Sequence, residues 1–161
     1  MSTRSPRPAE SVWDYPRPPR VEHIDDRVTI TLGGVMILDT TDVVRVLETS
    51  HPPAYYLLIS DFAAGTLSPA PGISVCEFKG HARYLTLSAG GQTAEAAGWT
   101  YDNPWPGFET LSGRLALYPG RMDACTVAGE TVIPQEGGFY GGWITSWVTG
   151  PFKGAPGTRG W

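Results

Sequence analysis

Glycine and proline constrain the fold of this chain more than any other residues. Together they make up 35 of its 161 residues, about 22% where roughly 12% is usual. Both residues interrupt helices and mark turns. We therefore expect short elements joined by many turns, in a chain whose length suits one domain with a single core.

Short apolar runs lie between the turns, and their patterns are typical of β-strands. Residues 28–32 alternate apolar side chains with threonine, and Gly33-Gly34 then predicts a hairpin. By such patterns we expect strands at 28–32, 35–38, 43–48, 54–59, 73–78, 82–87, 92–101, 115–118, 125–127 and 130–133. A loop is expected at 63–72 and one or two helical turns at 104–111. The sequence therefore predicts a mainly β fold with antiparallel sheets.

The two ends of the chain differ from its middle in composition. Residues 1–20 hold four arginines and five prolines and predict an extended arm, followed by a single β-rich domain at 21–161. Trp13 and Tyr15 favour an arm that docks on the domain's own surface over a partner-binding tail. Residues 137–161 hold eight glycines and six aromatic residues. We expect this tail to wrap the β core, the alternatives being a homodimer surface or a pocket lid.

The charge balance argues against a nucleic-acid partner. The formal net charge is −4, and residues 21–161 alone carry −6. A protein that binds a polyanion needs a clustered basic face. No apolar run has the length of a membrane span, and the first residues lack the apolar core of a secretory signal. We therefore expect a cytoplasmic protein without a membrane partner.

Motifs for several familiar chemistries are missing from the sequence. Two cysteines are too few for a disulfide framework, and neither a Cys-x-x-Cys nor a His-x-x-x-His spacing occurs. The sequence therefore predicts no metal site and no cofactor. It also lacks a Gly-x-Ser-x-Gly motif and a phosphate-binding glycine loop, which argues against hydrolases and nucleotide-binding proteins of familiar type.

A series of motifs between Val21 and Ile133 carries a family resemblance. They are Gly33-Gly34, the run Leu47 to Pro53 with Tyr55-Tyr56, Asp61, Cys76 to Gly80, Tyr84, Trp99 to Tyr101 with Pro104, Leu115 to Tyr118, Asp123 and Gly129-Glu130. In this order they resemble the bacterial family known as domain of unknown function 427. The resemblance implies a β-tent fold, in which two sheets meet at an angle with a cleft between them. The family's label refers to nucleotidyl transfer, but no close acidic pair that could hold magnesium lies on a predicted strand.

The chain has only two lysines, and each lies in a Phe-Lys-Gly triplet. A lysine in a chain that otherwise uses arginine could be a nucleophile, a proton donor or a phosphate contact, because lysine changes its charge state more readily. The alternative is that each lysine simply caps a turn. The two interpretations are equally supported for Lys79, and the turn is favoured for Lys153.

Cys76 and His51 are further candidates for chemistry. Cys76 lies three residues before Lys79, and a nearby cation would favour its reactive thiolate. Strand alternation places the two on opposite faces, however, so an inert core thiol is favoured for Cys76, as it is for Cys125. His51 follows Glu48 and precedes two prolines that fix its backbone, which suits either a positioned acid or base or simply a rigid turn.

Three functional hypotheses follow from these residues. The first is a small-molecule-binding domain with a polar-aromatic cleft. Its candidate residues are Glu48, Tyr56, Cys76, Lys79, Tyr84, Trp99 and Tyr101. The second is an enzyme, of transferase type, that uses Cys76 or Lys79 as nucleophile with help from His51 or Asp61. The third is a structural or assembly module that uses the C-terminal tail as its contact surface.

The hairpin that contains Lys79 allows a prediction of geometry. A three-residue loop at 79–81 would pair Glu77 with Arg83 and Cys76 with Tyr84. We expect the cleft on the face that Cys76 and Tyr84 share. Lys79 reaches this face only if the turn redirects its side chain.

Overall fold

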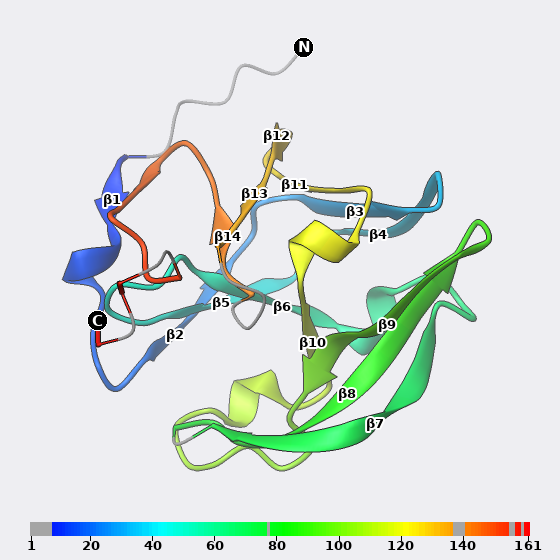
Figure 1. The fold of residues 1–161 in the computed structure, drawn as a ribbon, viewed down its shortest axis with the longest axis horizontal. Coiled ribbons are helices and arrows are strands. Elements are labelled where there is room, and N and C mark those ends of the chain that lie inside the picture. Colours follow the sequence, from blue (N-terminus) through cyan, green and yellow to red (C-terminus); the bar gives the residue numbers. More distant parts are fainter. Residues whose placement is uncertain (1–7, 77, 137–140, 155–156, 159) are drawn as a thin grey trace.

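The computed structural model describes residues 8–76, 78–136, 141–154, 157–158 and 160–161, which form β-strands and short 3-10 helices (Figure 1). One sheet has seven strands in the spatial order β2 (Arg20–Ile24), β5 (Val43–Leu47), β6 (Ala54–Leu58), β10 (Arg114–Leu117), β9 (Gln92–Thr100), β8 (Gly80–Ala89) and β7 (Leu67–Cys76). A second sheet has the order β12 (Glu130–Thr131), β11 (Ala124–Val127), β3 (Val28–Leu32) and β4 (Val35–Thr40). Every pairing within these two sheets is antiparallel, so the predicted mainly β, antiparallel fold is confirmed.

The smaller elements connect and cover the two sheets. Two further pairs of short strands are β1 (Glu10–Ser11) with β15 (Val148–Thr149), which is parallel, and β13 (Ile133–Pro134) with β14 (Trp143–Ile144). The 3-10 helices are η1 (Val12–Asp14), η2 (Ile59–Asp61), η3 (Glu109–Leu111) and η4 (Pro119–Arg121). Of the helices described, none has the length and apolar character needed to span a bilayer.

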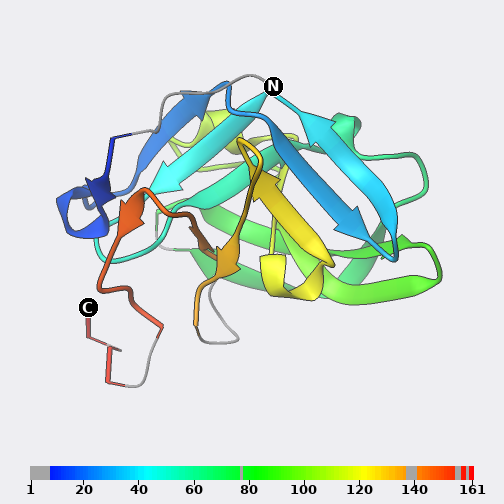
Figure 2. The ribbon, with the colours of Figure 1, turned by 90° about the horizontal axis from the view of Figure 1, so that it is seen from above.

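The seven-stranded sheet is buried on both faces near its centre. One face packs against the four-stranded sheet, and the strands of the two layers cross at an angle (Figure 2). The other face carries a second, smaller core that includes Tyr56, Tyr101 and Phe108. Strand β5 shows why both faces are filled, because it is buried at every position. Val43 belongs to the first core and Val44 to the second, as the alternation of a strand requires.

Two glycine turns bring the sheets into direct contact. Gly33-Gly34 forms the predicted hairpin between β3 and β4, where Leu32 lies opposite Val35. Gly90-Gly91 joins β8 to β9 in the same way. A Cβ atom added at Gly33 would lie 2.2 Å from the backbone oxygen of Ala89, and one at Gly90 would lie 1.9 Å from that of Gly33. Only glycine allows the two turns to approach this closely.

The segment predicted as a loop at 63–72 is a strand from Leu67 onward, so that prediction was wrong. Strand β7 is the outer strand of its sheet. An edge strand tolerates Pro69 and Pro71, because it has no neighbour on its outer side to which a missing amide hydrogen would have to donate. A register shift between Pro69 and Ile73 accommodates the extra residues. The helical turns predicted at 104–111 are reduced to the single turn η3.

The predicted register of the β7–β8 hairpin was also wrong. Cys76 lies opposite Gly80, not opposite Tyr84, and Arg83 lies opposite Ile73. Glu77, its predicted partner, lies outside the described residues, and Arg83 donates instead to Asp102 over 2.6 Å. The partner of Cys76 differs from the predicted one by an even number of residues, so Cys76 and Tyr84 still share one face of the sheet.

Both ends of the described chain pack on the β-sheets. In the N-terminal segment Val12 and Tyr15 are buried, whereas Trp13 is 42% exposed and donates to the backbone oxygen of Pro151. In the tail Trp143 is fully buried and stacks on Tyr55 with ring centroids 4.7 Å apart. Two of the six aromatic residues of the tail, Phe139 and Tyr140, lie outside the described residues.

Candidate functional site

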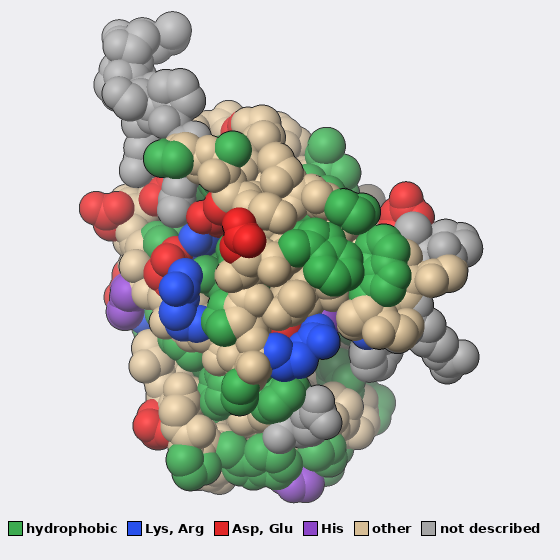
Figure 3. Space-filling view, turned by 90° about the vertical axis from the view of Figure 1, so that its left-hand side faces the viewer, with side chains coloured by type: hydrophobic (Ala, Val, Ile, Leu, Met, Phe, Trp, Pro, Cys, Tyr) green, Lys and Arg blue, Asp and Glu red, His purple; other side chains and the backbone are tan. Residues whose placement is uncertain are grey.

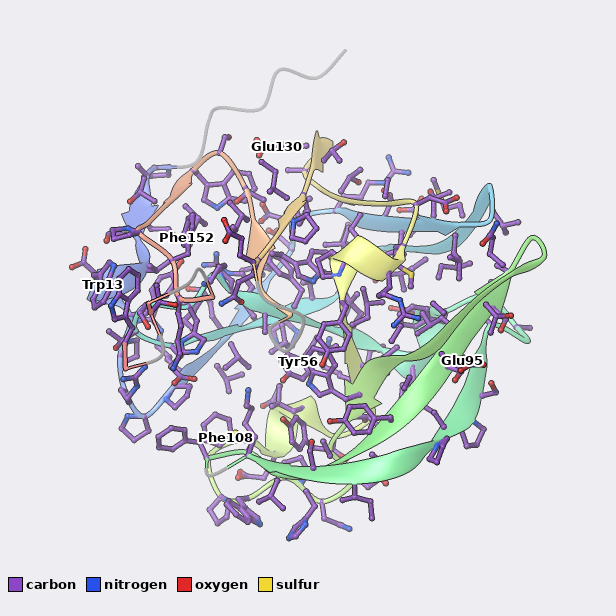
Figure 4. All side chains as sticks on the ribbon, viewed as in Figure 1. Trp13, Tyr56, Glu95, Phe108, Glu130 and Phe152 are labelled. Atoms are coloured by element: carbon purple, nitrogen blue, oxygen red, sulfur yellow. The ribbon has the colours of Figure 1, made fainter. Side chains whose placement is uncertain are left out.

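Two adjacent cavities open beside the second core of the seven-stranded sheet, and Lys79 and Trp99 line both of them. We name them after one residue that is particular to each. The His51 cavity has a volume of about 180 Å³ and the Tyr84 cavity one of about 250 Å³. The sticks in Figure 4 place Tyr56, which lines the His51 cavity, near the middle of the molecule, with Phe108 of the second core below it.

The His51 cavity contains Glu48, His51 and Tyr56 of the predicted residues. Its other walls come from Val46, Pro52, Ala54, Gln135, Gly141 and Gly142. The last three come after β13, and Gly142 lies against Pro52, just before β6. Gln135 holds this part of the chain in place, because its side chain accepts from the amide of Gly142 and donates to the backbone oxygen of Lys153.

The turn that carries Glu48 and His51 is held by the N-terminal segment. The amide of Ser50 donates to the backbone oxygen of Val12 over 3.0 Å, and Arg17 lies 3.2 Å from the Glu48 carboxylate. The prolines after His51 then fix the start of β6. This part of the site is therefore assembled from segments that are far apart in the sequence.

His51 is a half-buried ring with one nitrogen already engaged. Its Nδ1 lies 2.9 Å from the backbone oxygen of Thr49 and 3.9 Å from the Glu48 carboxylate. Burial lowers the pKa of His51 below its ordinary value, and this outweighs the hydrogen bond to Thr49 and the charge of Glu48, which act in the opposite direction. The imidazole is therefore neutral at pH 7.

The Tyr84 cavity is built on the face of the sheet that Cys76 and Tyr84 share. Tyr84 lies directly opposite Trp99 in the β8–β9 pairing, so both rings project from the same side. The Tyr84 hydroxyl donates to Ser74 Oγ over 2.9 Å. The ring of Tyr118 lies 4.8 Å from that of Trp99. The remaining walls come from Val75, Cys76 and Tyr101.

Lys79 lies between the two cavities. Strand β7 ends at Cys76, so Lys79 is outside the strand's alternation, and the turn directs its side chain toward the second core. Its Nζ lies 3.5 Å from the Tyr56 hydroxyl and 5.9 Å from the ring centres of both Tyr56 and Tyr101. These rings attract the ammonium through their π-faces. No carboxylate of the described residues lies within 4 Å of Nζ.

The charge state of Lys79 follows from its surroundings. Burial works to lower its pKa, but Tyr56, Cys76 and, to a smaller extent, the carboxylate of Glu48 outweigh it and raise the pKa of Lys79 above its ordinary value. The amine is therefore a cation at neutral pH. It can donate hydrogen bonds to an anion, but it has no free lone pair with which to act as a nucleophile.

The two cysteines occupy different environments. Cys76 is half-buried and lines the Tyr84 cavity together with Lys79. Cys125 is 2% exposed in the first core, and burial raises its pKa to about 12. Cys76 is therefore the thiol that a solute in the cavity can reach.

Two other candidates lie elsewhere. Asp61 is an exposed residue of η2 that accepts from Thr40 over 2.8 Å, and it lines neither cavity. Lys153 borders a third cavity beside Phe152 and donates to the backbone oxygen of Trp161 over 3.3 Å. Its Phe-Lys-Gly triplet thus has a different position from that of Lys79.

Several wall residues were not predicted from the sequence. Tyr118 ends the motif Leu115 to Tyr118, so its place in that motif was a signal for it. Ser74 lies on the same face of β7 as Cys76, which a correct register would have indicated. No local sequence pattern indicated Gln135, because it reaches the site only through the way the chain after β13 packs on the sheet.

Charged side chains of both signs lie close together on one face of the molecule. Figure 3 shows basic and acidic side chains close together on the face that holds the N-terminal segment, without a continuous basic patch on that face. The His, Cys, Asp and Glu side chains of the described residues form no cluster of three that could hold a metal ion.

Comparison with known proteins identifies the family of this chain. No curated protein matches the chain. A sequence profile of a protein family matches residues 20–128, which contain all of β2 to β11 and most of the lining of both cavities. The chain belongs to the family described as domain of unknown function DUF427.

Proposed function

We propose that this chain binds a small molecule in the His51 and Tyr84 cavities. The observation that carries the proposal is the half-buried ammonium of Lys79, which lies between two cavities and two tyrosine rings. No carboxylate of the described residues lies within 4 Å of it, and the charge of Glu48 acts on it only from a greater distance. A half-buried charge is costly unless something compensates for it. A ligand in either cavity would supply that compensation.

The composition of the walls supports the same proposal. Small-molecule sites combine aromatic and apolar surfaces with a few polar groups that fix the orientation of the ligand. Trp99 offers its indole to both cavities, and Tyr84 and Tyr101 add rings and hydroxyl groups to one of them. The family's short label refers to nucleotidyl transfer. Nucleotides therefore belong among the compounds to be tested.

A thermal-shift screen of metabolites, nucleotides included, tests the proposal. A ligand at 100 times its Kd adds about 2.7 kcal/mol of stability, and each kcal/mol raises the melting temperature of a domain this size by about 2–4 °C. Trp99→Leu should abolish the shift because it alters both cavities. Trp13→Leu is the matched control, since Trp13 is exposed and lines neither cavity. The proposal fails if no compound stabilises the chain, or if the shift is the same in Trp99→Leu.

An enzyme that uses Cys76 is the second candidate function. The observation in its favour is that Cys76 lines the same cavity as the cationic Lys79, although strand alternation had predicted opposite faces. This arrangement suits an enzyme because the cavity holds both a thiol that a solute can reach and a cation that can bind an anionic substrate. Lys79 itself is less suited to be the nucleophile, because it is protonated at neutral pH.

A further inference from the structure

We infer that the Tyr84 cavity takes a flat aromatic compound with one anionic group, and that Lys79 Nζ binds this group. The inference rests on the proposed function, because it names the class of ligand for one of the two cavities. It follows from the charges, the rings and the volume of the cavity, which we take in turn.

The charges that line the Tyr84 cavity are of one sign. Its polar groups are the ammonium of Lys79, the hydroxyls of Ser74, Tyr84, Tyr101 and Tyr118, and the thiol of Cys76. None of these lining residues carries a carboxylate. The single acidic residue among the walls of the neighbouring cavity is Glu48, which interacts with Arg17 and His51 and whose charge also acts on Lys79 from more than 4 Å away. An anion in the Tyr84 cavity would therefore meet a cation and hydroxyl donors.

The hydroxyl groups remain donors at neutral pH. Burial raises the pKa of Tyr101 and of Tyr118 above the ordinary value for tyrosine, so both phenols keep their protons. Hydrogen bonds to an ionised acceptor are stronger than those between neutral groups. On binding, the anionic group would thus exchange its hydrogen bonds to water for hydrogen bonds from the Lys79 ammonium and the tyrosine hydroxyls.

The rings and the volume limit the remainder of the ligand. Trp99 and Tyr118 lie with ring centroids 4.8 Å apart and planes inclined at 51°, and Tyr84 projects from the strand beside Trp99. Such walls favour a flat, apolar body that packs against aromatic faces. The volume of about 250 Å³ lies below the roughly 300–1,000 Å³ of sites for drug-sized molecules, which indicates a compound with a single ring.

Calorimetric titration of the full chain with matched probes tests the inference. The probes are benzoate, its neutral isostere benzamide, and phenyl phosphate, which distinguishes a carboxylate from a phosphate. We expect at least one of the two anions to bind roughly 10- to 100-fold more tightly than benzamide, as for a hydrogen bond to a charged group. Added sodium chloride should lower the affinity for the anion and leave the affinity for benzamide unchanged.

Variants of the two lysines locate the effect. Lys79→Met should lower the affinity for the anion by roughly 10-fold or more and leave that for benzamide unchanged, and Lys79→Arg should retain most of the affinity. Lys153→Met is the matched control, because it changes the other Phe-Lys-Gly triplet and should have no effect.

The outcomes separate the inference from the function on which it rests. If both anions bind no better than benzamide to the unaltered chain, the inference is overturned, whether or not Lys79→Met folds. The same holds if Lys79→Met folds and binds the anion as tightly as before. In either case the proposed function survives as long as some compound of the screen stabilises the chain and loses its effect in Trp99→Leu. If no compound does so, both fail.

Discussion

At the scale of single residues, burial distinguishes the two thiols of this chain. Cys125 is 2% exposed with a pKa raised to about 12, whereas Cys76 is half-buried at the edge of the Tyr84 cavity. The thiolate is the nucleophile in alkylation, so we expect iodoacetamide to modify Cys76 and to spare Cys125 in the folded chain. Mass spectrometry after a short reaction at about pH 7.5 measures the extent of modification of both cysteines. Unfolding in urea should make Cys125 reactive as well.

The rate of that reaction also bears on the enzyme hypothesis. An enzyme in which Lys79 activates Cys76 requires that Cys76 react faster in the unaltered chain than in Lys79→Met, and that Lys153→Met leave the rate unchanged. Equal rates in Lys79→Met and in the unaltered chain would contradict a role for Lys79 in activating the thiol.

His51 makes the stability of the chain depend on pH in a defined direction. Burial lowers its pKa in the folded state, whereas in the unfolded chain the ordinary value of about 6.5 applies. As the pH falls below about 6.5, the unfolded chain takes up the proton first, so the free energy of unfolding decreases until folded His51 is protonated as well. At higher pH both states hold a neutral ring, and His51 contributes no pH dependence.

Urea unfolding between about pH 7.5 and about pH 5 measures this effect. We expect the loss of stability toward low pH to be smaller in His51→Asn, in which the side-chain amide can still donate to the backbone oxygen of Thr49. His81→Asn is the matched control, because it makes the same substitution at an exposed histidine that lines neither cavity. A His51→Asn profile that coincides with that of the unaltered chain would contradict the prediction.

At the scale of elements, the contact between two hairpin turns couples the two sheets. Gly33 and Gly34 both have positive φ, +58° and +76°, so alanine is strained at either position. Only at Gly33 does the added Cβ also collide with the backbone of the β8–β9 turn. We expect Gly34→Ala to lower the free energy of unfolding by about 1 kcal/mol, and Gly33→Ala by about 1–3 kcal/mol more. Equal losses in denaturant unfolding would show that the turns do not need this close contact.

The same elements show which parts of the fold local patterns encode. Residues 28–32 with Gly33-Gly34 were predicted as a strand and turn because alternation and positive φ are local properties. The β7–β8 turn was placed wrongly because Gly80 was taken as a loop residue, whereas it is the first residue of β8, with φ of +118°. A Cβ there would lie 3.4 Å from Trp105, a contact with a residue beyond β9 that no local pattern records.

The candidate site also has features that local patterns predict and features that depend on long-range contacts. Trp99 and Tyr101 could be expected on one side of a sheet because they are two residues apart on one predicted strand. That Tyr84 lies beside them depends on the β8–β9 register, which shifts between Leu85 and Leu87. The separation of the site into two cavities could not be predicted, because Lys79 turns inward only after the strand has ended, and because Gln135 and Gly142 arrive with the tail. These features depend on long-range packing.

At the scale of the whole molecule, two tryptophans of the tail are buried against the rest of the chain. Trp143 is fully buried and Trp147 is 9% exposed, and the parallel pair of β1 with β15 joins the tail to the N-terminal segment. A homodimer through the tail stays a prediction. Light scattering of the full chain tests it by measuring the molar mass in solution. Residues that a second copy could use include Ile133 of β13, just before the tail, which is 63% exposed.

Removal of the tail should therefore unfold the chain or leave it far less stable. Truncation after Pro134 removes Trp143, whose ring stacks on Tyr55 and whose Nε1 donates to the backbone oxygen of Leu117. A tryptophan ring buries about 150–250 Å², worth about 4–6 kcal/mol at about 25 cal/mol per Å², and a domain has only about 5–15 kcal/mol in total. Truncation also uncovers Tyr55 and removes the partner strand of β1.

Single substitutions in the full chain separate burial from chain length. Trp143→Leu should lower the free energy of unfolding by about 3 kcal/mol or more, because it leaves a cavity in the first core. Trp13→Leu, at an exposed tryptophan, should lower it by less than about 1 kcal/mol. Urea unfolding of both variants, with calorimetry of the truncated chain, measures these effects. A truncated chain that melts within a few degrees of the full one would show that the two sheets are stable without the tail, and the walls of the His51 cavity formed by Gln135, Gly141 and Gly142 would then be dispensable to the fold.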